Sequence, residues 1–165
     1  IIREFGEDLR VGLEWLEMCE FRDRYVLKGV AEAMKIYVCH KHSNSIDAVQ
    51  NLKLQVEQSL PKSLFYNVGS EEDASDERAE IEVKNCSFFM IFLTKGALLK
   101  QYVLSQIQYA VQFKKPMMLV METDKLYGGS NLSEETQTLE NDDLIDVFKQ
   151  NMMIPWSREV SMQEG

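Results

Sequence analysis

Residues 87–93 read SFFMIFL, the most continuously apolar stretch of this 165-residue chain. A strand that is apolar on both faces is typical of the interior of a parallel sheet that helices cover on both sides. Similar short runs of apolar, aromatic and β-branched residues predict four further strands, at 35–40 (KIYVCH), 63–68 (SLFYNV), 116–121 (PMMLVM) and 152–156. We therefore expect a sheet of five strands.

Apolar residues at three- and four-residue spacing predict helices between these strands. A mostly polar helix is expected to run to about Asn85, another to follow Gly96, and a short one to begin at Asn141 as its cap and end at Gln150. A further helix is expected between the first two strands. It should stop at Pro61, because proline cannot continue a helix. Its apolar stripe is Ile46, Val49, Leu52, Val56 and Leu60.

The alternation of strand and helix predicts right-handed crossovers and a mostly parallel sheet. The simplest closure is a flavodoxin-like three-layer α/β sandwich. In that strand order, ligands bind at the carboxyl ends of the first and third strands, where the connections diverge. The polar segments expected at this edge are a turn at 41–45 and the loops at 68–73 and 94–96, whereas 122–139 is expected to be a long surface loop.

The charge balance is acidic, with 18 Lys and Arg against 27 Asp and Glu, a net charge of −9 and a pI near 4.8. This balance argues against a nucleic-acid partner and against docking on an anionic membrane. No apolar run approaches the roughly 20 residues of a membrane span, and no signal peptide is expected. Three cysteines without CxxC spacing fit a reducing compartment, so we expect a cytoplasmic protein that does not insert into membranes.

The chain begins with Ile1 rather than Met, so we expect it to be a fragment of a longer protein. Residues 1–33 have a helical pattern and are interpreted as a linker or as the end of a preceding domain. Residues 34–157 hold the strands and form one domain, and residues 158–165 are a tail.

The same residues resemble the Toll/interleukin-1 receptor (TIR) domain family. The likeness covers roughly residues 34–156. Residues 35–45 (KIYVCHKHSNS) are similar to the first box of the family, and residues 88–100 (FFMIFLTKGALLK) to its central strand and the segment after it. Other similar pieces are 102–110 (YVLSQIQYA), 114–120 (KKPMMLV) and 153–156.

Many TIR domains that hydrolyse NAD use a glutamate in the helix after the third strand. The matching residue here is Gln106, and the helix expected at 97–113 contains no Asp or Glu. An amide can hydrogen-bond a ribose hydroxyl, but it supplies no negative charge to an oxocarbenium-like centre. The resemblance therefore implies a signalling or scaffold domain of innate-immunity type that needs no cofactor. The alternatives are an NAD⁺ hydrolase or ADP-ribosyl cyclase, including one inactivated by a Glu-to-Gln exchange, and a nucleotide-sensing domain that binds NAD⁺ without cleaving it.

The resemblance and the strand order together imply where a ligand and a partner would bind. The partner would be another TIR-like domain or a second copy, in a weak homo-oligomer that salt disrupts. Its contact surface would be an acidic one that meets a basic patch at Lys95, Lys100, Lys114 and Lys115; the acidic residues are Glu71, Glu72, Asp73 and Asp76. The loop at 69–73 lacks the basic-acidic pair and the Pro-Gly that the family commonly has there. NAD⁺ would enter a cleft lined by His40, Lys41, His42, Ser43, Thr94, Lys95, Gly96 and Tyr102.

Two polar clusters contain residue types that bind metals, but neither has the ligands or the spacing that a metal site requires. His40 and His42 follow Cys39, but a structural zinc site needs four ligands. The acidic residues after Gly69 lack the spacing of a calcium loop and are interpreted as a solvated helix start. No P-loop, GxGxxG or GxSxG motif is present, which disfavours kinase, dehydrogenase and α/β-hydrolase chemistry.

Overall fold

The computed structural model describes residues 34–60, 62–69 and 75–156. The expectations for 1–33, for Glu71, Glu72 and Asp73, and for 158–165 lie outside these residues. The elements in chain order are β1 (Lys35–His40), α3 (His42–Ser59), β2 (Leu64–Tyr66), α4 (Asp76–Asn85), β3 (Phe88–Leu93), η3 (Ala97–Leu99), α5 (Gln101–Gln112), β4 (Met117–Glu122), η4 (Lys125–Tyr127), α6 (Leu132–Thr136), α7 (Asp142–Gln150) and β5 (Met153–Trp156).

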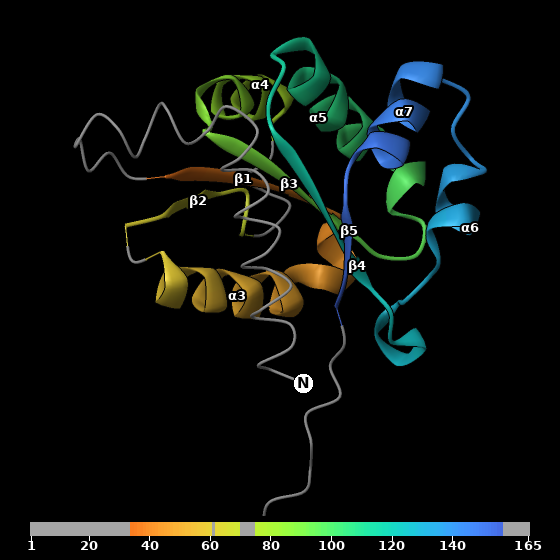
Figure 1. The fold of residues 1–165 in the computed structure, drawn as a ribbon, viewed down its shortest axis with the longest axis horizontal. Helices are drawn as coiled ribbons and strands as arrows, with labels where there is room; N and C mark the ends of the chain where they lie inside the picture. The colour runs from red at the N-terminus through yellow and green to blue at the C-terminus, as the bar shows by residue number, and fades with distance from the viewer. Residues whose placement is uncertain (1–33, 61, 70–74, 157–165) are drawn as a thin grey trace, which may run out of the picture.

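The five strands form one sheet in the order β2-β1-β3-β4-β5, and all four pairings are parallel (Figure 1). This order confirms the flavodoxin-like prediction. Strand β3 lies at the centre, with Ile36 of β1 opposite Phe88 and Met117 of β4 opposite Phe89. All six residues of β3 are buried, as its unbroken apolar sequence predicted.

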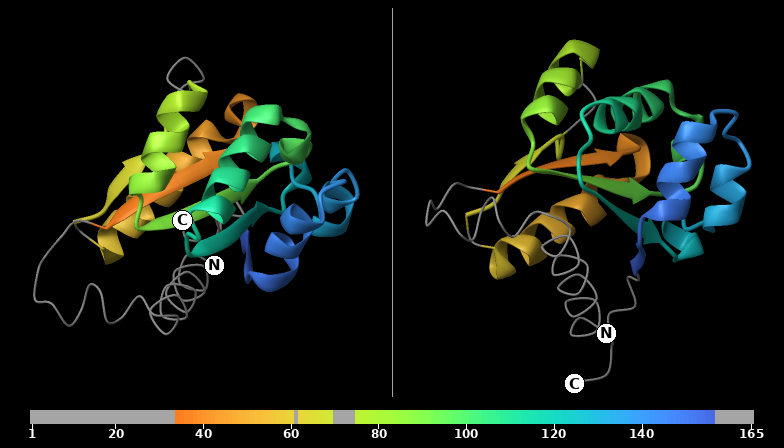
Figure 2. Two further views of the ribbon diagram at one scale, coloured as in Figure 1. Left: turned by 90° about the horizontal axis from the view of Figure 1, so that it is seen from above. Right: turned by 45° about the horizontal axis from the view of Figure 1, so that its top comes forward.

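Helices cover both faces of the sheet (Figure 1, Figure 2). Successive side chains of each strand pack alternately against the helices of one face and of the other. Phe89 and Ile91 point to the layer of α4, α5 and α7, while Met90 and Phe92 point to the layer of α3. Burial of each such side chain stabilises the fold by about 1.5–3 kcal/mol. The two helix layers cover the faces of the sheet, and the loops converge at the carboxyl ends of its strands. These strand ends are called the carboxyl edge below.

The helix boundaries differ from the sequence expectations at three places. The helix expected at 97–113 is divided into η3 and α5, with Lys100 between them. Helix α3 begins at His42, so residues 41–45 are its first turn rather than a separate turn. The hydroxyl of Ser45 donates back to the carbonyl of Lys41, four residues earlier, which suits a serine within a helix. The segment 122–139 is not a plain loop, because it contains η4 and α6. Asn131 caps α6 by accepting the N–H of Glu134 at 2.9 Å.

Strand β5 forms one edge of the sheet. The carbonyls of Met152 and Trp156 accept the N–H groups of Leu119 and Thr123, so these residues face β4. The alternate residue Pro155 therefore turns its backbone to the outer side. Among the described helices, none combines the length and the apolar character needed to cross a membrane.

Candidate functional site

A buried histidine ends β1 at the carboxyl edge of the sheet. His40 is fully buried, and its Nε2 lies 2.8 Å from the carbonyl oxygen of Asn67. Because a carbonyl only accepts, Nε2 carries the hydrogen, and in the neutral ring Nδ1 accepts from the Ser45 hydroxyl at 2.7 Å. That hydroxyl also lies 2.6 Å from the carbonyl of Lys41. Because a hydroxyl has a single hydrogen, the ring nitrogen and the Lys41 carbonyl compete for it.

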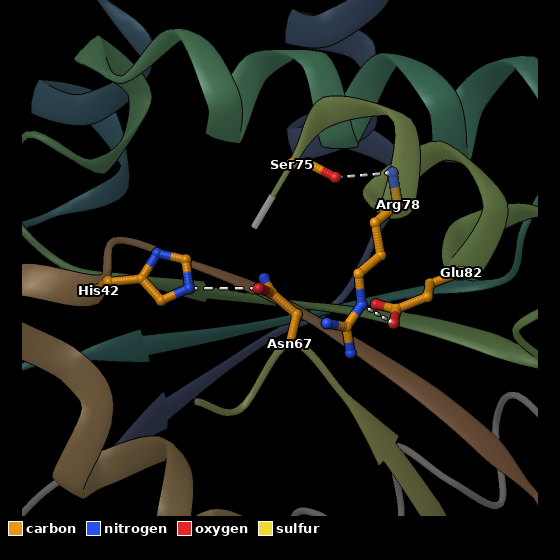
Figure 3. A network of polar contacts seen from close by, with 5 residues as sticks. All are labelled: His42, Asn67, Ser75, Arg78 and Glu82. Carbon is orange, nitrogen blue, oxygen red and sulfur yellow. Dashed lines mark hydrogen bonds and ion pairs between the residues drawn. The ribbon is translucent and has the colours of Figure 1, made fainter. Parts of the chain in front are cut away.

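Asn67, directly after β2, links this histidine to the rest of the edge. It adopts a left-handed backbone conformation with φ 61°, which asparagine tolerates better than most residues. Its side-chain nitrogen donates to the carbonyl of Val38 at 2.8 Å and, more weakly, to Oε1 of Gln106 at 3.5 Å. Its oxygen accepts from Nε2 of His42 at 3.2 Å (Figure 3). Asn67 therefore joins β1, β2, α3 and α5 at one point.

The second histidine packs between the first one and a tyrosine of α5. The ring of His42 lies 4.4 Å from that of His40 and 5.4 Å from that of Tyr102, measured between centroids. The hydroxyl oxygen of Tyr102 accepts the backbone N–H of His42 at 3.2 Å. The Nδ1 atom of His42 is buried without a hydrogen-bond partner, which leaves one acceptor in the interior unused.

Burial lowers the pKa of His40 to about 4, with a smaller contribution from the neighbouring His42; the carbonyl of Asn67 acts in the opposite direction. At neutral pH the ring of His40 is therefore uncharged. An uncharged imidazole with both nitrogens engaged supports the ends of β1 and β2 rather than binding an anion.

The loop after β3 completes the edge. Thr94 donates its hydroxyl hydrogen to Oδ1 of Asn44 at 2.8 Å, and Nζ of Lys41 donates to the carbonyl of Lys95 at 3.1 Å. The N–H of Gly96 lies 3.0 Å from both carboxylate oxygens of Glu135 on α6. Gly96 has φ 73°, a conformation that glycine adopts without steric cost.

The structure gathers the expected cleft residues at one edge, but several of them are enclosed. His40, His42 and Thr94 are buried and bonded within the chain, as is Gln106, of which 1% is exposed. The residues of the expected cleft that remain at least partly accessible are Lys41, Ser43, Lys95, Gly96 and Tyr102. The two imidazoles are therefore enclosed in the described structure rather than open to solvent.

The expected basic patch is divided between two places. Lys95 and Lys100 precede α5 and lie at the carboxyl edge, whereas Lys114 and Lys115 follow this 12-residue helix, about 18 Å away along its axis. Nζ of Lys115 is also engaged, donating to the carbonyls of Lys84 and Cys86. A single patch of four lysines does not form, because α5 separates its halves.

Figure 3 also draws the start of α4, through Ser75 and Arg78. Ser75 caps this helix by accepting the N–H of Arg78 at 3.3 Å, and the Arg78 side chain pairs with Glu82 at 2.7 Å. Asp76 is exposed and accepts a hydrogen bond from the hydroxyl of Tyr109 at 2.9 Å. Asp76 is thus the described member of the expected acidic surface.

Two residues of the edge escaped the sequence reasoning. Asn67 lies within the strand expected at 63–68, whereas the observed β2 ends at Tyr66, and an asparagine near a strand end is a signal for a left-handed residue. Glu135 is buried, although it lies in the segment 122–139 that the sequence predicts to be a surface loop. The pattern Asn131-x-x-Glu134, a cap followed by a helix start, could have placed α6 and hence Glu135.

An open pocket of about 370 Å³ lies beside this edge, at the ends of β3 and β4. In the parts of the chain that the structure describes, no three His, Cys, Asp or Glu side chains gather as a metal site would require. The pocket residues are Lys95, Thr123, Lys125, Gly129, Ser130, Asn131 and Glu134.

In comparisons with known proteins, the sequence matches no family model and no curated protein. The functional argument therefore depends on the sequence resemblance, the fold and the side chains at the carboxyl ends of the strands.

Proposed function

We propose that this chain is a TIR-like signalling or scaffold domain of the cytoplasm that associates with itself or with another TIR-like domain. The proposal rests on the resemblance of residues 34–156 to that family together with one observation in the fold. Gln106, the residue at the position of the family glutamate, is a buried neutral amide held by Asn67. The chemistry that the family performs at this place needs a carboxylate.

The surroundings of Gln106 support a role without catalysis. Helix α5 carries no Asp or Glu along its whole length. Both ring nitrogens of His40 are engaged, by Ser45 and Asn67, and Nε2 of His42 is engaged by Asn67. Loss of an electrostatic partner for a developing positive charge would slow the reaction by roughly two or more orders of magnitude.

The charges of the surface support association between copies. Lys95 and Lys100 are exposed at the carboxyl edge of a chain whose net charge is −9. The negatively charged side chains of Asp76 and Glu77 are exposed at the start of α4. In the sequence, this helix follows the acidic residues 71–73. Two different surfaces of opposite charge would give a head-to-tail contact, and such a contact weakens as salt screens it.

Sedimentation velocity tests this association. Reversal of the charges at Glu71, Glu72 and Asp73 to lysine should abolish association that the unmodified chain shows at low salt. A matched control reverses Glu140, Asp142 and Asp143, which are exposed at the start of α7. If both triple variants sediment like the unmodified chain, the proposed acidic surface is wrong.

Turnover of NAD⁺ tests the absence of catalysis and addresses the alternative, an NAD⁺ hydrolase or ADP-ribosyl cyclase. The chain is compared with Gln106→Glu at high protein concentration, because the site would close only on assembly. We expect no turnover by the chain itself. Activity of Gln106→Glu alone would agree with a site that lacks its carboxylate, whereas turnover by the unmodified chain would refute the proposal. Saturable NAD⁺ binding without product would instead favour the nucleotide-sensing alternative.

A further inference from the structure

The pocket at the ends of β3 and β4 has a cationic side. Lys95 follows β3 and Lys125 begins η4, and both are exposed. Within the described residues, no hydrogen bond or ion pair engages the ammonium group of either one. In a chain with a net charge of −9, two such lysines at one pocket favour an anionic ligand.

The rest of the lining of the pocket is polar and includes an acceptor. The carboxylate of Glu134 and the side chains of Ser130 and Asn131 lie there. Ser130 Oγ is 3.4 Å from the Glu134 carboxylate, and Asn131 uses its side-chain oxygen for the cap of α6, so its amide nitrogen remains a donor. A carboxylate repels an anion but accepts hydrogen bonds from hydroxyl groups. The ligand is therefore expected to carry both an anionic group and hydroxyl groups.

The walls of the pocket are fixed by backbone hydrogen bonds. The N–H of Lys95 donates to Gly128 at 2.8 Å, and the N–H of Gly129 donates to Asp124 at 2.7 Å. Thr123 bonds to the carbonyl of Trp156 through both its N–H, at 2.9 Å, and its hydroxyl, at 2.8 Å. A pocket that is formed before binding loses little entropy when the ligand enters.

Its position and size also suit a small ligand. In Figure 1 the loop after β3, η4 and α6 surround this side of the sheet, at the carboxyl ends of the strands. Ligands of doubly wound sheets bind at that edge. A volume of about 370 Å³ falls within the range of small-molecule sites.

We propose that this pocket binds a phosphorylated sugar, with the phosphate on Lys95 and Lys125 and the sugar hydroxyls on Glu134, Ser130 and Asn131. This site is separate from the buried histidines, but it shares Lys95 with the basic surface proposed above for association. The charge-assisted contacts of the two lysines supply affinity, and Glu134 distinguishes a sugar phosphate from a bare phosphate.

Calorimetric titration with glucose 6-phosphate tests the site, with glucose and inorganic phosphate as separate probes. We expect saturable binding of glucose 6-phosphate, weaker binding of phosphate and no binding of glucose. The double variant Lys95→Ala/Lys125→Ala should weaken the binding of glucose 6-phosphate by about tenfold or more. Lys149→Ala, a lysine paired with Asp146 on α7, is the matched control and should change nothing.

A second variant separates the contribution of the hydroxyl groups from that of the anionic group. Glu134→Gln should reduce the preference for glucose 6-phosphate over phosphate while phosphate itself binds no more weakly. Amide resonances of Gly129 and Ser130 should shift on titration in the unmodified chain. Absence of binding, equal affinity for the two anions, or binding that survives loss of both lysines would overturn the proposal. The sedimentation and NAD⁺ experiments change residues outside this pocket (Glu71, Glu72, Asp73 and Gln106), so failure of the titration and failure of the proposed function are distinguishable.

Discussion

Acidification should destabilise the fold through His40. Its pKa is about 4 in the folded chain, compared with about 6.5 for an unperturbed histidine. Because the folded-state pKa is the lower one, the unfolded chain binds more protons between these values, so the free energy of unfolding decreases as the pH falls through this window. The full difference corresponds to about 3 kcal/mol, of which about 2 kcal/mol is lost on going from pH 7 to pH 5.

Chemical denaturation at a series of pH values measures this loss. The 27 acidic residues of the chain also titrate on acidification, so the comparison is with His40→Gln, in which they are unchanged. The free energy of unfolding of the unmodified chain should fall by about 2 kcal/mol more than that of the variant between pH 7 and pH 5. An NMR titration of the imidazole resonances, with only two histidines in the chain, gives the pKa directly.

The opposite sign of this difference would refute the reasoning. Both nitrogens of His40 face oxygen atoms, Nδ1 that of Ser45 and Nε2 that of Asn67. A charged ring would donate to both and would release the hydroxyl hydrogen of Ser45 for the carbonyl of Lys41. If these bonds outweighed the burial of the charge, the pKa would be raised and acid would stabilise the unmodified chain relative to His40→Gln.

Three further substitutions test single features by chemical denaturation. Asn67→Ala should cost about 1–3 kcal/mol, because it removes the bonds to Val38 and His42 from a residue with φ 61°; Asn67→Gly, which keeps the backbone conformation, should cost less, and the reverse order would contradict the role of the backbone. Gly129→Ala should cost about 1–3 kcal/mol, because a Cβ there would lie 2.5 Å from the Thr123 carbonyl carbon; a neutral effect would show that this loop can move. Asn141→Ala should cost about 1 kcal/mol, since Asn141 accepts the N–H groups of two residues at the start of α7, and an unchanged midpoint would mean that the cap contributes nothing.

The sequence was sufficient for the layers of the fold and for its strand order. The unbroken apolar run at β3 indicated a buried central strand, and the alternation of elements limited the topology to a few choices. The cap at Asn141 was also visible, because asparagine before an apolar helix is a local signal. These features depend on residues that are close together in the chain.

The details of the edge were not predictable in the same way. The start of α3 was missed because Lys41 makes no side-chain cap, so no local residue marks it. The enclosure of His40 and His42 depends on Asn67, which is 27 residues from His40 and comes from another strand. The division of the lysine patch depends on the direction of α5, which separates Lys100 from Lys114. The positions of the charged residues in the sequence do not give this direction. Long-range packing decides the second and third of these features.

The edges of the sheet limit how two copies could meet. Strand β2 has three residues, and β5 places Pro155 on its outer side, where proline has no N–H to offer. A neighbouring strand that tried to extend the sheet at β5 would lack a donor in the middle of a four-residue strand. Growth of the sheet from one molecule into the next is thereby disfavoured at this edge. Reversible contacts through side chains are then open to the domain at high local concentration, while fibre-like stacking of strands is discouraged.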